Sequence, residues 1–480
     1  MNNSSNKLKM NIAYNVVFQI LNIIVPLFTA PYVFRILGKE GIGIYGYTFS
    51  IAHYFSLFCM LGILNYGNRE ISMVSDDREK CSMAFWQIYG IQFIAGIISI
   101  ITYIAVVSQL KSDYYDVFLI QGIIVISSMF DICWFFFGIE NFRFTTIISM
   151  LNKVLTTSFI FLLVKSPNHV PIYTGIIAVG SLLNVFVYWI FLKRYVYFKI
   201  EYIKHLSSHI KPILLLFIPV IAINIYKYID KIMLGMMLNV SEVGTFEAAE
   251  KLQNLPMCLI AAFGTVMLPR ISNMTSKNEE SAIHHYNKLS FILVMFLTIG
   301  MAFGLAGIAN VFIPIFYGTG YEDSELVLLL LLPSMVFVGW ANIIRTQYLL
   351  PRKMDSIFCS SVIAGAMVNI MANIIFIPLY GAVGAAISTT IAEFTVCLYQ
   401  SIISFKPMGL KESLIDSMPF LAIGLVMCLC IMHIFLNNNI VTVVIRLVAG
   451  GVLYVGMSLF VLKRNIPIRV VISKRKKGNE

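Results

Sequence analysis

Charged side chains inside an apolar stretch near the middle of the chain have types and spacing suited to holding an anion. Residues 223–235 read INIYKYIDKIMLG, in which Lys227, Asp230 and Lys231 interrupt an otherwise apolar run. At 100° per helical residue, Lys231 lies about 40° to one side of Lys227 and Asp230 about 60° to the other. Asn224 lies on the Lys231 side. These residues share one stripe of a helix, and its two ammonium groups could bind a phosphate by charge-assisted hydrogen bonds.

The next apolar segment carries acids that could neutralise part of this stripe. Its charged residues stand at positions i, i+3 and i+4: Glu247, Glu250 and Lys251. Folding the two segments back on each other places Lys231 level with Glu247. The same register places Asp230 level with Glu250. Either structural ion pairs lock this hairpin, with Lys231 reaching toward the membrane surface, or a cationic, water-filled cavity receives an anionic headgroup. Lys227 has no acid level with it, which favours the cavity.

Other ionisable residues also stand in apolar segments. Folding the chain between Asp131 and Lys153 places these two residues level with each other, and a buried ion pair is the simpler interpretation. Glu393, in TTIAEF, is a lone acid that either couples transport to H⁺ or Na⁺ or pairs with a cation. Arg345 either contacts a substrate or extends to the membrane surface. For Arg446 we expect packing or lipid contact.

The composition indicates that lipid is the main solvent of this chain. Of its 480 residues, 59% are hydrophobic and 12% are charged, and the mean hydropathy is +0.83. Soluble domains usually carry about 25% charged residues, so a membrane location is expected. A bare charge at the centre of a bilayer costs at least about 2.5–3.5 kcal/mol on insertion scales. The charges described above therefore need partners or water.

Motifs for catalysis or metal binding are missing from the sequence. The eight cysteines are scattered without a CxxC spacing and are expected to act as small hydrophobic residues. No GxxxxGK[ST], HExxH or GxSxG motif occurs, and the connections are too short for a soluble catalytic domain. We therefore expect no catalytic residues, no metal and no cofactor. A carrier, a channel or a scaffold is expected rather than an enzyme.

Fourteen segments are long and apolar enough to cross a bilayer, which takes about 20 residues. Their runs are continuous rather than alternating, which favours helices over barrel strands. The sequence thus predicts an all-α polytopic membrane protein. The expected spans are 11–33, 41–64, 83–108, 114–138, 145–165, 171–192, 209–236, 243–268, 288–316, 325–350, 356–379, 381–404, 414–436 and 440–463.

Lys and Arg residues are distributed asymmetrically between the predicted connections. With a cytoplasmic N-terminus, only four of the 35 fall in external loops: Arg35, Lys39, Lys111 and Lys165. Cytoplasmic loops carry an excess of Lys and Arg, so both termini are expected in the cytoplasm. This asymmetry explains most of the +11 net charge without nucleic acid. The tail at 473–477, SKRKK, is expected to anchor near anionic lipid.

An internal repeat divides the predicted spans into two lobes. RILGKEGIGIYGYTFS (35–50) matches KIMLGMMLNVSEVGTFEAAE (231–250), so that Gly38 corresponds to Gly235 and Gly43 to Gly244. Carriers with parallel repeats place the substrate site between the lobes near mid-membrane. Prolines at matching places, Pro26, Pro31 and Pro219, predict interrupted helices there. The expected parts are a six-span lobe at 1–192, a cytoplasmic linker at 193–208, a second six-span lobe at 209–404, and two accessory spans with a basic tail at 405–480.

Several longer stretches resemble one family of membrane proteins. They are PLFTAPYVFRILGKEGIGIYGYTFSI (26–51), LNYGNREIS (64–72), WFFFGIENF (134–142), YIDKIMLG with VGTFEAAEKL (228–252), and RTQYLLPRKMD with NIIFIPLYGAVGAAISTTIAE (345–393). Over at least residues 10–465 the chain resembles the bacterial polysaccharide transporters, the Wzx-type flippases of lipid-linked oligosaccharides. These share a superfamily with multidrug/toxin extruders and lipid II flippases.

The resemblance implies two lobes that open alternately to the two sides of the bacterial cytoplasmic membrane. The implied cargo is an oligosaccharide repeat unit on undecaprenyl diphosphate, held in a cationic cavity and driven in some members by an ion gradient. It gives the cation role to Lys227, Lys231, Lys153, Arg345 and Arg35. The candidates for ion coupling or ion pairing are Asp230, Glu393, Asp131, Glu247 and Glu250. The resemblance also implies proximity to a polysaccharide polymerase and a chain-length regulator. Twelve spans are common in such flippases, so fourteen is a departure.

Rival functions predict different features. The product polymer of a flippase could be capsule, O-antigen or exopolysaccharide. A drug or cation extruder of the same fold would have a cavity dominated by Asp and Glu, whereas Lys leads here. A lipid II flippase would carry a similar anionic headgroup and differs only in its family pattern. A membrane glycosyltransferase or polymerase would need a large external loop or an acidic catalytic motif, and a scaffold would not need the charged stripe.

Overall fold

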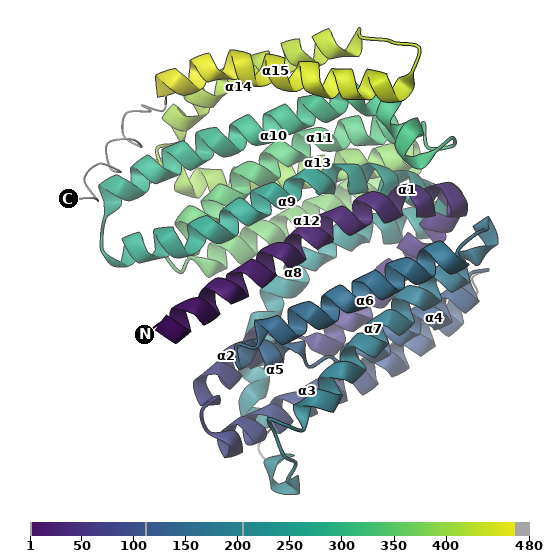
Figure 1. Cartoon of the computed structure of the whole chain (residues 1–480), viewed down its shortest axis with the longest axis vertical. Helices are drawn as coiled ribbons and strands as arrows, with labels where there is room; N and C mark the ends of the chain where they lie inside the picture. Colours follow the sequence, from purple (N-terminus) through teal and green to yellow (C-terminus); the bar gives the residue numbers. More distant parts are fainter. Residues whose placement is uncertain (1, 111–112, 204–205, 466–480) are drawn as a thin grey trace. The chain divides into compact units, whose positions relative to one another are not determined.

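Every regular element in the described residues is a helix (Figure 1). The computed structural model describes residues 2–110, 113–203 and 206–465. The predicted anchor at 473–477 lies outside these residues. The elements are α1 (Asn2–Met60), α2 (Ile63–Val74), α3 (Arg78–Gln109), α4 (Tyr115–Phe130), α5 (Cys133–Gly138), α6 (Phe142–Leu163), η1 (Pro167–His169), α7 (Val170–Leu192), η2 (Ile200–Ile203), α8 (Ser207–Met237), α9 (Val240–Ser276), α10 (Glu280–Tyr317), α11 (Ser324–Ile344), η3 (Arg345–Leu349), α12 (Asp355–Tyr380), α13 (Ala382–Ser404), α14 (Leu410–Met432) and α15 (Asn439–Asn465).

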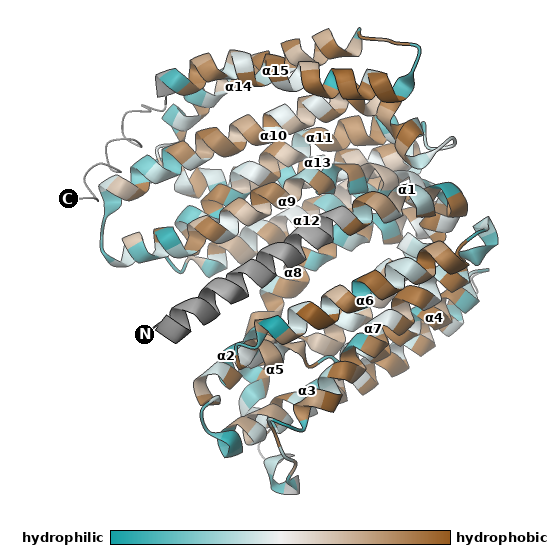
Figure 2. Cartoon of the chain, in the orientation of Figure 1, coloured by the Kyte–Doolittle hydropathy of each residue, from teal (hydrophilic) through white to brown (hydrophobic). Residues whose placement is uncertain are grey.

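Thirteen helical segments within the described residues are long and apolar enough to cross a membrane. Figure 2 shows hydrophobic residues along most of their length and hydrophilic residues gathered toward helix ends and connections. α1 explains the difference from the fourteen predicted spans, because it contains the first two of them on either side of a kink. The prediction of an all-α polytopic membrane fold is confirmed.

Gly38 makes the kink in α1. Its φ of 67° and ψ of 177° are not helical, while helix continues on both sides of it. Glycine reaches positive φ readily because it has no Cβ. The short loop expected between the first two spans is therefore a bend inside one helix. Between α8 and α9, by contrast, Leu238 and Asn239 form a short break at the predicted place.

The expected helix interruptions at prolines do not occur. α1 continues through Pro26 and Pro31, and α8 continues through Pro219. A proline removes one backbone hydrogen bond, and transmembrane helices tolerate this where neighbouring groups satisfy the freed carbonyl.

The predicted fourth span, 114–138, is divided into α4 and α5 at Asp131. The Asp131 Oδ1 accepts a hydrogen bond from the N–H of Cys133, the first residue of α5, at 2.9 Å. Gln92 of α3 satisfies backbone at the break, because its Nε2 donates to the carbonyl oxygens of Ser128 at 3.0 Å and Asp131 at 2.7 Å. A helix break inside a membrane needs such internal partners, since lipid offers none.

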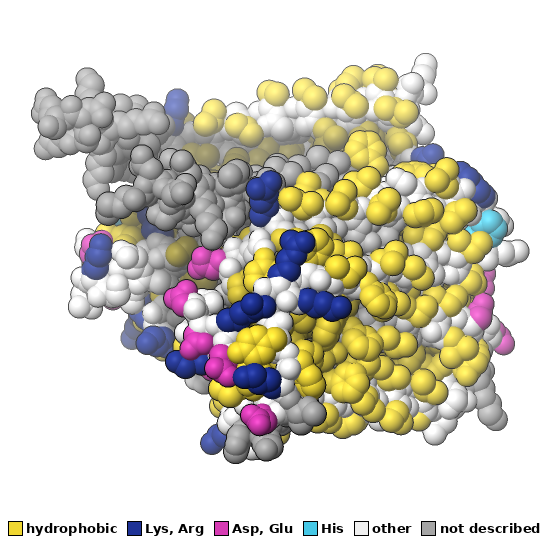
Figure 3. Space-filling model, turned by 60° about the horizontal axis from the view of Figure 1, so that its bottom comes forward, with side chains coloured by type: hydrophobic (Ala, Val, Ile, Leu, Met, Phe, Trp, Pro, Cys, Tyr) yellow, Lys and Arg dark blue, Asp and Glu magenta, His cyan; other side chains and the backbone are white. Residues whose placement is uncertain are grey.

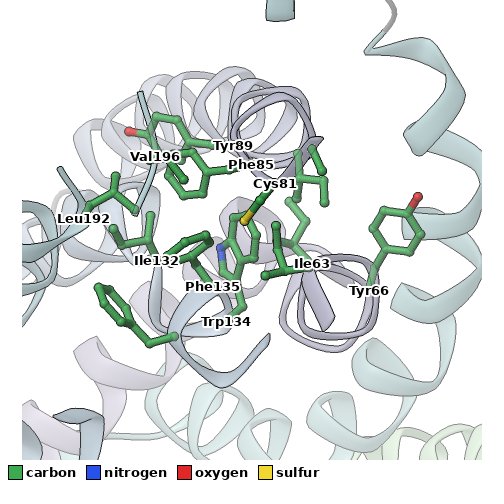
Figure 4. Packing of buried hydrophobic residues seen from close by; sticks show 14 of the residues in the cluster. Ile63, Tyr66, Cys81, Phe85, Tyr89, Ile132, Trp134, Phe135, Leu192 and Val196 are labelled. Atoms are coloured by element: carbon green, nitrogen blue, oxygen red, sulfur yellow. The ribbon is translucent and has the colours of Figure 1, made fainter. Parts of the chain in front are cut away.

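A hydrophobic cluster surrounds this break. Figure 4 shows Trp134 and Phe135 of α5 packed among side chains of neighbouring helices, including Phe85 of α3 and Ile63 of α2. Trp134 is fully buried, and its Nε1–H donates to Gln92 Oε1 at 3.0 Å. Gln92 therefore joins the broken helix to α3 through both ends of its amide.

The contacts within the chain divide it into two compact units, residues 1–247 and 248–480. The first unit contains α1 to α8 and the first turns of α9, and α8 packs against α1, α2 and α3. His209 of α8 makes polar contacts with two of these helices. The Tyr66 hydroxyl of α2 lies 2.6 Å from His209 Nδ1, and Gln87 Oε1 of α3 lies 2.9 Å from His209 Nε2. The lobe boundaries at 192 and 209 stay a prediction from the repeat.

The second unit has its own core around α10. Phe291, Ile292 and Val294 of α10 pack with residues of α11 and α14, such as Ile344 and Phe420. α15 adds Tyr454, whose hydroxyl donates to the Phe296 carbonyl at 2.8 Å.

Arg446 of α15 is fully buried in the second unit, which agrees with the packing role that was one of the two expected for it. Its guanidinium donates to the carbonyl oxygens of Gly307, Met432 and Ile434 at 2.9–3.0 Å, and to Asn310 Oδ1 at 2.9 Å. An arginine can be buried when its donors are satisfied in this way. Arg446 thus ties α15 to α10 and to the end of α14.

One face of the molecule is broadly hydrophobic, and charged residues gather along one edge of that face (Figure 3). The exposed apolar residues of α3 include Ile94, Ile98 and Ile101, which recur at helical spacing and are 55%, 58% and 62% exposed. Such a face would be unfavourable in water. It is the surface expected of helices that face lipid.

Candidate functional site

An ion pair joins α8 to the start of α9. Lys231 Nζ lies 2.5 Å from Glu247 Oε2, and the two side chains are 8% and 20% exposed. The predicted alignment of these residues is therefore confirmed. Lys231 Nζ also lies 5.7 Å from the ring centroid of Tyr228, one turn earlier. A buried cation with an anion on one side and an aromatic face on another is well compensated.

Lys227 lies one turn before this pair and has a different environment. Its side chain is exposed, and it forms no ion pair with any other residue that the structure describes. Asp230, on the other edge of the stripe, is 2% exposed. Asn224 Oδ1 lies 3.4 Å from His53 Nε2 of α1, so the stripe faces α1. The stripe thus combines one neutralised lysine with one that remains available to a ligand.

A row of aromatic rings on α1 leads to this stripe. Tyr45 and Phe49 stack with centroids 5.6 Å apart, and Phe49 and His53 stack at 5.7 Å. His53 then meets Tyr228 of α8 at 4.3 Å. All four rings are half-buried. Tyr45 also contacts Tyr173 of α7 at 4.9 Å, so the row connects three helices of the first unit.

The backbones of α1 and α9 meet beside this row. A Cβ on Gly43 would overlap the carbonyl oxygen of Val240, and a Cβ on Gly244 would overlap the carbonyl oxygen of Lys39. Only glycine permits so close an approach. On the next turn, a Cβ on Gly46 would lie 3.4 Å from Glu247 Oε2. The glycines therefore hold the acid of the ion pair against α1.

The other candidate residues of the first unit lie away from this pair in sequence. Arg35 is exposed on α1, one turn before the Gly38 kink. Lys153 is half-buried on α6. Asp131 accepts the hydrogen bond from the Cys133 N–H described above, and its pairing with Lys153 stays a prediction.

The remaining candidates belong to the second unit. Glu250 is half-buried on α9, and Glu393 is half-buried on α13. Arg345 begins η3, a turn of π-helix that follows α11, and its guanidinium lies 5.7 Å from the ring of Phe358 in α12. π-turns inside helices are frequent at functional sites. The pairing of Asp230 with Glu250 stays a prediction.

Sequence reasoning missed the aromatic row. Its members on α1 recur at i, i+4 and i+8 in IYGYTFSIAH (44–53), a spacing that places three rings on one face of a helix. That spacing could have identified Tyr45, Phe49 and His53. The fourth ring, Tyr228, stands between the two lysines of the stripe, and its own helix carries no matching aromatic spacing that would reveal its role.

Comparisons with known proteins agree with this architecture. A family model described as "Polysaccharide biosynthesis protein" matches residues 8–275, more than half of the chain. A protein of Escherichia coli (strain K12) named "Putative O-antigen transporter" is 25% identical over 417 residues, which cover 84% of this chain and 97% of that protein.

Solved structures share the fold at low sequence identity. A structure described as "Lipid II flippase MurJ, inward closed conformation" aligns with a TM-score of 0.75 and 18% identity, covering 95% of this chain and 99% of that one. An inward-facing multidrug resistance MATE family transporter of the MOP superfamily aligns with a TM-score of 0.60 and 13% identity, covering 83% of this chain and 99% of that one. With the MurJ- and MATE-like fold and the family match together, the chain belongs to the polysaccharide biosynthesis protein family.

Proposed function

We propose that this chain is a flippase that moves an oligosaccharide repeat unit linked to undecaprenyl diphosphate across the bacterial cytoplasmic membrane. The product would be used for a surface polysaccharide such as capsule, O-antigen or exopolysaccharide. The family match and the name of the Escherichia coli relative support this class of function. A polymerase and a chain-length regulator are the proteins expected nearby, and both termini are expected in the cytoplasm.

The observation that carries the proposal is the state of Lys227. It is an exposed cation on an apolar helix, one turn from a lysine that already has its anion. Moving a diphosphate through hydrocarbon is costly because its charges lose their water. Lys227 would replace part of that water with a charge-assisted hydrogen bond. The ion pair with Glu247 would keep Lys231 from binding the diphosphate in place of Lys227. Alternatively, the pair would separate when the headgroup arrives, and Lys231 would then bind it as well.

The aromatic row would hold the sugars of the same cargo. Sugar rings present apolar C–H faces, and aromatic side chains bury such faces while their polar edges bind hydroxyl groups. Tyr45, Phe49 and Tyr228 offer half-buried rings, and His53 and Tyr45 add polar atoms. A diphosphate at Lys227 would place the first sugars beside Tyr228.

Alternating access requires that the pathway closes on one side while it opens on the other. In this structure the part of α1 just after the Gly38 kink packs onto the start of α9 through the reciprocal contacts of Gly43 and Gly244. We propose that separation of these two glycine contacts opens the pathway on the side of the membrane where they lie. The lipid tail of the cargo would remain in the bilayer while its headgroup passes.

A lipid II flippase is the second candidate, since lipid II shares the undecaprenyl diphosphate and the MurJ-like fold is present. Purified protein in liposomes would be offered three fluorescent cargoes: an undecaprenyl-diphosphate oligosaccharide, lipid II and an organic cation. We expect the oligosaccharide lipid to exchange between leaflets much faster than in empty liposomes. Exchange of lipid II alone would support the second candidate, and transport of the cation alone would contradict both.

A further inference from the structure

Two neighbouring hollows in the second unit share part of their lining. The first, about 610 Å³, is lined by α10, α11 and α14. The second, about 690 Å³, is lined by α11, α13 and the connection that leads to α14. Phe337, Trp340 and Leu414 line both, so the two hollows lie next to each other. We call the two hollows together the Trp340 groove. It runs from Lys406, just beyond the end of α13, to Ala306 in the middle of α10.

The deep part of the groove is apolar and opens on an apolar surface. Ala302 and Ala306 stand one turn apart on α10 and leave room because their side chains are small. The rim residues Ile402 of α13 and Met418 of α14 are 70% and 62% exposed. An apolar rim of this kind is stable against hydrocarbon and not against water. The groove therefore faces the acyl region of the membrane.

A buried donor and an exposed cation lie at the other part of the groove. The Trp340 Nε1–H is buried and lacks an acceptor, counted over the residues that the structure describes. Ser401 is 6% exposed and its hydroxyl has the Cys397 thiol as a hydrogen-bond partner. Lys406 is exposed, and no salt bridge to it is found in the described segments. Buried donors without acceptors are uncommon and point to a missing ligand.

We propose that the Trp340 groove binds one anionic diacyl phospholipid. Its phosphate would lie at Lys406, which stands at the membrane surface beyond α13. An ester carbonyl would accept the Trp340 Nε1–H. One acyl chain would then extend past Phe337 to Ala306. The order of the groups along the groove, the Lys406 cation first, the Trp340 donor next and the apolar walls last, is the order of the groups in a phospholipid.

Other occupants fit less well. Water would find few polar partners in the deep part, whose lining is almost entirely apolar. A partner helix is about 10–12 Å across with its side chains and would leave the Trp340 donor unsatisfied unless it placed an acceptor there. A zwitterionic phospholipid would fill the groove equally but would gain less at Lys406, because its headgroup has no net charge. The bound lipid would fill the space between α10, α11, α13 and α14 and stabilise their packing.

Native mass spectrometry of the full chain in detergent tests this directly. Delipidated protein would be titrated with phosphatidylglycerol and, separately, with phosphatidylcholine carrying the same acyl chains. We expect a single tight phosphatidylglycerol adduct, with affinity about fivefold above that for phosphatidylcholine, since one surface lysine supplies attraction of that size. Because the readout is lipid binding, its result is independent of whether the chain flips the proposed cargo.

Three variants and one matched control locate the site. Lys406→Gln should remove the preference for phosphatidylglycerol, whereas Lys411→Gln, an exposed lysine at the start of α14 outside the groove lining, should keep it. Trp340→Phe should weaken both lipids equally, because the ester carbonyl is common to them. Ala306→Phe should abolish both by filling the acyl part of the groove.

Several results would overturn the proposal. They are equal binding of the two phospholipids to the wild type, a preference that survives Lys406→Gln, or occupation by undecaprenyl phosphate with exclusion of phosphatidylglycerol. Ala306→Phe could disturb folding, which a melting curve would reveal. Lys406→Gln changes only an exposed side chain, so the comparison with Lys411→Gln decides the question by itself.

Discussion

Gly43 and Gly244 make reciprocal contacts between α1 and α9. Gly43 packs on the backbone of Val240, and Gly244 packs on the backbone of Lys39. The two glycines correspond in the sequence repeat, and their offset of 201 residues also relates Lys39 to Val240. Lys39 stands one turn before Gly43, and Val240 stands one turn before Gly244. Gly43 contacts Val240 and Gly244 contacts Lys39, which is the contact pattern of a two-fold axis. The repeat thus has a structural consequence inside the first unit.

Replacing Gly43 with alanine should open this contact. Its Cβ would overlap the Val240 carbonyl oxygen, so the backbones must separate, at a cost of about 1–3 kcal/mol to the closed arrangement. We expect slower flipping and faster labelling of a cysteine introduced at Ser241 by a membrane-impermeant maleimide, with native thiols that react replaced. Gly451→Ala is the control, because a Cβ there meets nothing within 4 Å. Unchanged labelling in Gly43→Ala would exclude a role in closure.

Removing the acid of the buried pair should destabilise the first unit. Glu247→Gln removes the carboxylate that lies 2.5 Å from the buried Lys231 ammonium, and removing one partner of a buried ion pair typically costs about 3–5 kcal/mol. The double variant Lys231→Met, Glu247→Gln should recover most of the stability, because neither charge remains. Thermal unfolding in detergent measures both. If the single and double variants lose equal stability, the pair is not the reason for the loss.

The aromatic row should matter for the sugars and not for the diphosphate. Phe49→Ala should lower the affinity for the oligosaccharide-linked lipid about fivefold, since a stacking contact contributes about 1 kcal/mol. Binding of undecaprenyl diphosphate without sugars should be unchanged. Phe159→Ala on α6 is a suitable control, as that ring is 49% exposed and outside the row. Equal losses for both ligands would assign Phe49 to packing.

Gln92 should be needed for the broken helix at Asp131. Gln92→Leu removes the side-chain partner of the Asp131 carbonyl and of the Trp134 N–H, while the Ser128 carbonyl keeps only its bond from the Asp131 N–H. Each unsatisfied buried group costs about 1–3 kcal/mol, so a clear fall in melting temperature is expected. Trp134→Phe removes only one of these bonds and should fall less. A melting temperature unaffected by Gln92→Leu would mean that other groups satisfy the break.

The features of the first unit differ in how far the sequence predicts them. Lys231 and Glu247 are joined by a short turn, so helical geometry alone fixed their register, and the ion pair is confirmed. The kink at Gly38 was expected as a loop, because hydropathy marks the end of a span without showing that helix continues. The break at Asp131 depends on Gln92, 39 residues away, and no local pattern shows which side chain will satisfy a freed carbonyl.

The aromatic row illustrates the same limit. Three of its rings follow from spacing on α1, but the fourth comes from α8. Only the packing of α8 on α1 shows that Tyr228 and His53 meet. Local periodicity predicts which face of a helix carries the aromatic rings, whereas the residues that pack against that face are distant in sequence.

The exposed lysine of the stripe allows the most direct test of the proposed function. We would measure leaflet exchange of a fluorescent undecaprenyl-diphosphate oligosaccharide in proteoliposomes containing wild type, Lys227→Ala, Lys227→Arg or Lys211→Ala. Lys211 is an exposed lysine near the start of the same helix and controls for loss of one charge. We expect fast exchange in wild type and Lys211→Ala, loss in Lys227→Ala and partial recovery in Lys227→Arg. Exchange in Lys227→Ala as fast as in wild type would contradict the role of Lys227, and no exchange in wild type under an imposed H⁺ or Na⁺ gradient would contradict the flippase itself.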